Sequence, residues 1–139
     1  MIKRHLKKIL SFRSNQENSY DISGKKIFIH LRIEINANCN RKCSFCPRTS
    51  EELRKKNTER MPTSNVLSVI DQSLEMGFNG SVGFNFYNEP ALDDRLLYFL
   101  DYVLEKGLKT MIVTNGDVIK KNKEYAVEIF KRGDVNLSL

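Results

Sequence analysis

The sequence has no run of apolar residues that approaches the roughly 18 needed to span a membrane as a helix. Its basic start, MIKRHLKKILSF, also lacks the apolar core and the small-residue cleavage site of a signal peptide. These two absences lead us to expect a cytoplasmic protein. The 139 residues are 40% hydrophobic and 29% charged, an ordinary composition for one soluble domain with a sizeable core.

Cysteine is scarce, and all three cysteines lie in the stretch NANCNRKCSFCPR, from Asn36 to Arg48. An odd, clustered set is not typical of a disulfide framework and fits a reducing compartment. The sequence has no second cysteine pair of the kind that completes a structural zinc site. Of its two histidines, His5 lies in the basic start, and His30 lies too near the beginning of the first expected strand to reach the cysteines easily.

The chain carries a net charge of +6, much of it in the first 13 residues and in the RKK of Arg54 to Lys56. Such a charge distribution can indicate an arm that binds nucleic acid or an anionic surface. Aromatic residues are not regularly interleaved with these charges, as a base-stacking surface would require. We therefore interpret the two basic stretches as a solvated arm and a solvated loop. Nucleic acid is a less favoured partner.

Hydrophobic periodicity divides the chain into alternating strands and helices. Residues 1–12 fit a short amphipathic helix and residues 13–24 a polar linker. Strands are expected at 25–36, 81–87, 108–116 and from 134 onward, and helices at 61–77, 92–107 and about 119–132. The expected helix caps are Thr63 or Ser64 and Asp93, the expected stops are Gly77, Gly107 and Gly133, and the second helix should face the core with Leu96, Leu97, Leu100 and Leu104.

This alternation of strands and helices predicts an α/β fold of parallel βα repeats with right-handed crossovers. In such a fold, ligands gather at the carboxyl ends of the strands. Three distinctive loops follow three successive strands: the cysteine loop, YNEP at Tyr87 to Pro90, and TNG at Thr114 to Gly116. We therefore expect all three loops to meet at one edge of the sheet.

Three thiolates in one short loop can bind a single soft-metal centre, which could be zinc, copper(I) or an iron–sulfur cluster. The motif C-x₃-C-x₂-C directly after a strand, with Phe45 before the last cysteine, resembles the radical S-adenosylmethionine superfamily. The resemblance implies that Cys39, Cys43 and Cys46 ligate a [4Fe–4S] cluster whose remaining iron binds S-adenosylmethionine. It also implies that one electron from the cluster yields a 5′-deoxyadenosyl radical, which abstracts hydrogen from a substrate, and that Phe45 lies near the adenine.

The YNEP segment extends the resemblance, because the family often has a Gly-Gly-Glu-Pro-like segment there. Tyr87 and Asn88 replace the two glycines, and Asn88 can reach the left-handed backbone angles that glycine favours. Glu89 would bind the amino group of S-adenosylmethionine. Three further polar residues fall where the family contacts cofactor or substrate: Asn115, Asn136 and Ser138.

The resemblance implies the first half of a partial TIM-type barrel, ending in its fourth strand. Residues 1–24 would be a basic arm and linker, and residues 25–139 a truncated radical S-adenosylmethionine core domain. The chain would then be the N-terminal part of a longer enzyme. It would act on a peptide or a small metabolite and take electrons from a small protein of the flavodoxin or ferredoxin type.

Two alternatives remain open at this point. The first is an inactive remnant or scaffold that keeps the cluster but cannot enclose a substrate. The second is an RNA-modifying radical S-adenosylmethionine enzyme that uses its basic arm; its RNA binding should be steeply salt-dependent and lost when residues 1–13 are deleted.

Overall fold

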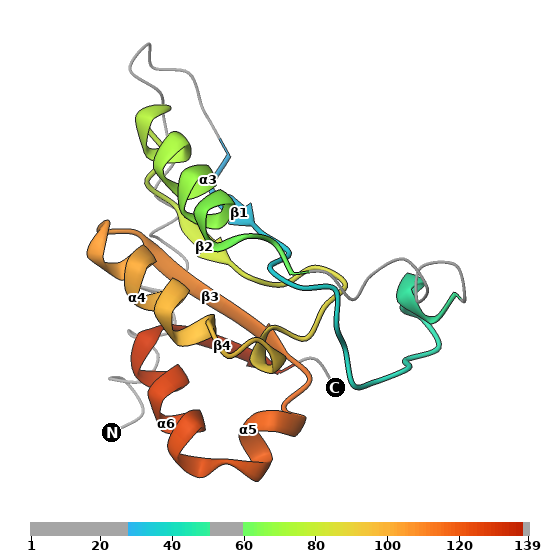
Figure 1. Cartoon of the computed structure of the whole chain (residues 1–139). Helices are drawn as coiled ribbons and strands as arrows, with labels where there is room; N and C mark the ends of the chain where they lie inside the picture. Colours follow the sequence, from blue (N-terminus) through green and yellow to red (C-terminus); the bar gives the residue numbers. More distant parts are fainter. Residues whose placement is uncertain (1–27, 51–59, 138–139) are drawn as a thin grey trace, which may run out of the picture.

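The computed structural model describes residues 28–50 and 60–137 (Figure 1). The expected amphipathic helix, the linker, the start of the first strand, the RKK stretch and Ser138 lie outside these described residues. Within the described ranges, no helix is long and apolar enough to cross a membrane.

The centre of the fold is a sheet of four parallel strands in the order in which they occur along the chain. The strands are β1 (His30–Arg32), β2 (Ser81–Gly83), β3 (Lys109–Thr114) and β4 (Asp134–Leu137). This arrangement confirms the parallel α/β prediction, because neighbouring strands in the sheet are connected through helices. The strands form a single row, and closure into a partial barrel stays a prediction.

Two strands end earlier than the periodicity predicted, and after β2 the cause is a side chain that bonds the backbone. Beyond Arg32 the alternating residues Ile33 and Ile35 are still buried, although they lie outside β1. Beyond Gly83 the side chain of Asn88 accepts the Phe86 N–H at 2.9 Å and donates to Phe84 O at 3.1 Å. These two hydrogen bonds fold the backbone into a turn where the pattern predicted a longer strand.

Three longer helices pack on the sheet and contribute to the apolar core. They are α3 (Thr63–Glu75), α4 (Leu96–Glu105) and α6 (Lys123–Arg132), with the shorter α5 (Asp117–Lys121) and the 3₁₀ turns η1 (Pro47–Thr49) and η2 (Pro90–Leu92). In Figure 1, α3 and α4 lie in front of the sheet and α6 packs next to α4. Buried side chains from β2, β3 and the three longer helices form the core, together with Phe84 just after β2: Val82, Ile112, Val66, Ile70, Phe99, Leu100 and Ile129.

Several predicted helix features are wrong in detail. Neither Thr63 nor Ser64 caps α3, because Pro62 occupies the cap position. In α4, Leu104 is exposed and Val103 is buried in its place. The single helix expected at about 119–132 is broken at Asn122, whose extended backbone and side-chain bond to Tyr125 N begin α6.

The predicted glycine stops have two different physical causes. Gly77 and Gly107 have φ values of 85° and 75°, the left-handed conformation that ends a helix at low cost. Gly133 has an extended φ of 166°, which any residue can adopt. A Cβ atom there would lie 2.9 Å from Thr110 O, so close approach to β3 requires the glycine.

Candidate functional site

The cysteine loop leaves the sheet at the carboxyl end of β1. Buried Ile35, Asn36 and Ala37 anchor its start, and the loop then extends away from the sheet in cyan and teal in Figure 1. Cys39, Cys43 and Cys46 form no disulfide, and each is partly buried. The Cys46 N–H donates to Cys43 O at 3.0 Å, so the last two cysteines share one turn.

The chemistry of these donors fits an iron–sulfur cluster or another soft metal centre, because three thiols outside any disulfide lie within eight residues of one loop. Their arrangement does not yet form a ligand set. No three His, Cys, Asp or Glu side chains in the described part of the chain lie close enough to hold a metal ion. Metal binding would therefore require the loop to draw the three thiols together, and the ligand assignment stays a prediction.

Glu89 lies at the same edge, after β2, and is only 2% exposed. Its Oε1 accepts hydrogen bonds from Thr114 Oγ1 at 2.6 Å and Ala91 N at 3.0 Å, and its Oε2 accepts one from Asn115 N at 2.7 Å. Its own N–H donates to Asn38 O at 2.7 Å. The carboxylate thus joins the ends of β2 and β3 to the segment that enters the cysteine loop.

Asn88, the residue before Glu89, has a local structural role in the chain. It is buried, and its side chain forms the turn bonds to Phe86 and Phe84. Its backbone does not use the left-handed conformation that glycine would favour, since no described residue other than glycine has a positive φ. A part for Asn88 in cofactor binding stays a prediction.

Asn115 connects the third-strand turn with the cysteine loop. Its side-chain amide donates to Asn40 Oδ1 at 2.8 Å and lies 3.9 Å from Cys39 Sγ. Phe45 is 76% exposed on the projecting loop. The backbone of Asn136 in β4 pairs with Val113 in β3. The contacts of these two residues with a cofactor stay predictions.

The sequence reasoning missed a second connection between the same two segments. Arg41 donates to both carboxylate oxygens of Asp117, at 2.9 and 2.6 Å, and Asn40 Nδ2 donates to Asp117 Oδ2 at 3.0 Å. The hydrogen bond from Arg41 lowers the pKa of Asp117 below its usual value. Opposite charges in two loops were visible in the sequence, but only the parallel topology brings these residues together.

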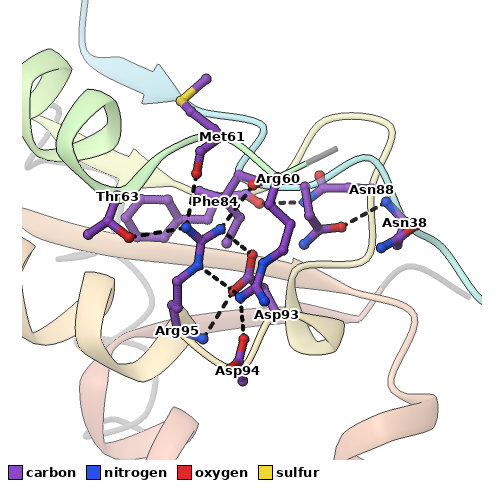
Figure 2. A network of polar contacts seen from close by, with 11 residues as sticks. Asn38, Arg60, Met61, Thr63, Phe84, Asn88, Asp93, Asp94 and Arg95 are labelled. Atoms are coloured by element: carbon purple, nitrogen blue, oxygen red, sulfur yellow. Dashed lines mark hydrogen bonds and ion pairs between the residues drawn. The ribbon is translucent and has the colours of Figure 1, made fainter. Parts of the chain in front are cut away.

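A network of charged side chains lies between the starts of α3 and α4 (Figure 2). Asp93 accepts hydrogen bonds from Arg60 Nη2 at 2.6 Å and from Arg95 Nε and Nη2 at 3.0 and 2.9 Å. Arg95 also donates to Met61 O at 2.9 Å and Ile35 O at 3.3 Å. The network therefore holds the backbone just before the cysteine loop against the start of α4.

Comparison with known proteins points to enzymes that depend on S-adenosylmethionine. The chain is 30% identical over 100 residues to the S-adenosyl-L-methionine-dependent 2-deoxy-scyllo-inosamine dehydrogenase of Niallia circulans. That match covers 70% of this chain and 39% of the dehydrogenase, so the chain spans about two fifths of this relative. No protein-family model matches the chain.

Two solved structures share the fold. The crystal structure of BtrN in complex with AdoMet and 2-DOIA matches with a TM-score of 0.68 and 28% identity, over 78% of this chain and 44% of that one. BtrN in an open conformation matches with a TM-score of 0.64 and 26% identity, over 78% and 48% of the two chains. The chain is thus similar in sequence and fold to part of an enzyme that binds S-adenosylmethionine and a small molecule.

Proposed function

We propose that the chain forms the cofactor-binding part of a radical S-adenosylmethionine enzyme. One observation carries the proposal: the three-cysteine loop, Glu89 and Asn115 meet at the carboxyl edge of a parallel sheet, in a chain similar to S-adenosylmethionine-dependent enzymes. In this proposal the sheet is the first half of a partial TIM-type barrel. Cys39, Cys43 and Cys46 would hold a [4Fe–4S] cluster, which supplies one electron for reductive cleavage of S-adenosylmethionine.

Glu89 would hold the ammonium group of S-adenosylmethionine. It is a buried carboxylate with three neutral hydrogen-bond donors and no ion pair to another described residue. A buried charge is usually paired, and Oε2 accepts a single hydrogen bond from the part of the chain that the structure describes, so it has room for a cationic donor. Phe45 would lie near the adenine, and Asn136 and Ser138 near the ribose or carboxylate.

The proposed substrate is a small polar molecule, oxidised at a carbon that bears a hydroxyl group. The dehydrogenase of Niallia circulans, named for 2-deoxy-scyllo-inosamine, supports this class over a peptide. Asn85, two residues beyond β2, adds support because its Oδ1 is buried without a hydrogen-bond partner among the described residues. Such an oxygen is suited to a hydroxyl or amine donor. The electron donor would be a small protein of the flavodoxin or ferredoxin type.

The deciding experiment is anaerobic reconstitution with iron and sulfide, followed by a reductant and S-adenosylmethionine. We expect 5′-deoxyadenosine to form, detected by chromatography and mass spectrometry. Cluster formation without 5′-deoxyadenosine would favour an inactive cluster-binding remnant. Protein that binds one zinc ion and no iron would refute the proposal.

Replacing Glu89 with glutamine is expected to leave the cluster in place but weaken S-adenosylmethionine binding by at least about tenfold, because the charge opposite the ammonium is lost. Equilibrium dialysis of the reconstituted protein measures the affinity. The substitution also turns an amide NH₂ toward one of the donors that Glu89 accepts, so some loss of stability is expected as well.

Thr114→Val is the matched control for that variant. It removes the 2.6 Å hydrogen bond to Glu89 Oε1 and keeps the negative charge. We expect lower stability with nearly unchanged affinity. Equal loss of affinity in both variants would show that Glu89 acts by supporting the fold and would remove it from the cofactor site.

A further inference from the structure

Two segments that lie 76 residues apart in the sequence are fastened together beside the first cysteine. One is Asn40 and Arg41 of the cysteine loop, and the other is Asn115 and Asp117 at the turn between β3 and α5. We call these four residues the latch. Each of them makes at least one hydrogen bond across the two segments, and Arg41 makes two to one carboxylate.

The latch also reaches both parts of the proposed cofactor site. From one side, the Asn115 amide lies 3.9 Å from Cys39 Sγ. From the other, the Asn115 backbone N–H donates to Glu89 Oε2 at 2.7 Å. A single residue therefore connects the first proposed metal ligand with the proposed ammonium partner, and the Arg41–Asp117 pair joins the cysteine loop to the chain two residues beyond Asn115.

The Arg41–Asp117 pair is suited to fixing geometry more than to stabilising the fold. Its two-point contact restricts the orientation of the planar guanidinium. Both side chains are about one third exposed, at 32% and 33%, and such pairs contribute little to global stability. Its loss should therefore free the loop and leave the core intact.

We infer that the latch positions Cys39 against the β3–α5 turn and so sets the place of the metal-binding loop relative to Glu89. Its members are positioning residues, and none is assigned a chemical step. The inference rests on the proposed function for its consequence in cofactor binding. The position of Cys39 in the metal-free protein is independent of that function.

The test is a charge exchange with two measurements. Arg41→Asp and Asp117→Arg are made singly and together, and Lys42→Ala, which removes an exposed cation of the same loop, is the control. The first measurement uses metal-free protein: pulse alkylation with iodoacetamide, followed by mass spectrometry of the peptide that contains Cys39. The second measures iron retained after anaerobic reconstitution and gel filtration.

Each single variant should raise the rate of Cys39 alkylation by about fivefold, as expected for loss of a partly exposed ion pair. Each should also retain less iron, while the melting temperature stays close to that of the parent. The exchanged pair should restore both values, and Lys42→Ala should change neither. Unchanged alkylation in the single variants, or a double variant no better than either of them, would overturn the inference.

The two ideas can fail separately. If no variant, nor the parent, binds iron but alkylation follows the expected pattern, the latch stands and the proposed function falls. If iron binds and 5′-deoxyadenosine forms in the parent and every variant alike, with equal alkylation, the proposed function stands and the latch is wrong.

Discussion

Replacing Cys43 with serine is expected to reduce iron retention by at least about 100-fold, because one of only three protein ligands to the proposed cluster is lost. A serine hydroxyl is a hard, weakly acidic ligand and a poor substitute for a soft thiolate. The broad visible absorbance of an iron–sulfur cluster should disappear with the iron. Iron, sulfide and absorbance are measured together after anaerobic reconstitution and desalting.

Ser44→Ala is the matched control, since Ser44 is an exposed neighbour in the same loop. It should retain the iron and absorbance of the parent. Cys39→Ser and Cys46→Ser should behave like Cys43→Ser, because each removes one of the three proposed thiolate ligands and none of the three thiols is held in a disulfide. A cluster that survives in Cys43→Ser would contradict the assignment of this residue as a ligand.

The layout of the fold was predictable because it depends on patterns that are local in the sequence. Strand and helix periods differ, and their alternation requires parallel strands joined by helical crossovers. From that topology alone, the cysteine loop, Glu89 and Asn115 were expected at one edge. The contacts of Asn115 with Glu89 and Cys39 confirm that they meet.

The polar interactions at this edge were not predictable, because they depend on which side chains the topology brings within reach. Nothing local marks Asp117 as the partner of Arg41, or Arg60 as a partner of Asp93. Hydrophobic periodicity also does not show where a side chain takes a backbone hydrogen bond away from a strand or a helix. The Asn88 side chain bonds the backbone after β2 and forms a turn where a longer strand was expected. Asn122 divides the one expected helix into α5 and α6.

Replacing Asp93 with asparagine is expected to lower the free energy of unfolding by about 3 kcal/mol. This is the typical cost of removing one partner of a buried charge pair. The Asp93 side chain is fully buried, and two arginines donate to it (Figure 2). Burial by itself would raise the pKa of Asp93, but the hydrogen bonds from Arg95 and Arg60 outweigh it and lower the pKa from 3.8 to about 2. Urea unfolding followed by circular dichroism measures the difference.

Asp94→Asn is the matched control, because Asp94 also pairs with Arg60 but its side chain is 81% exposed. We expect a change below about 1 kcal/mol there. The pH dependence gives an independent test. A carboxyl whose pKa is lower in the folded than in the unfolded protein stabilises the fold above its unfolded pKa, and this stabilisation is lost as the pH falls through the folded value.

For Asp93 this loss should run from about pH 4 to pH 2 and amount to about 2 kcal/mol. The amide introduced in the Asp93→Asn variant cannot titrate, so the difference between parent and variant should shrink over this range as the parent takes up its proton. The support for the cysteine loop should weaken with it, since Arg95 also holds Ile35 O just before the loop. A difference that stays constant from pH 7 to pH 2 would show that the carboxylate charge of Asp93 does not stabilise the fold.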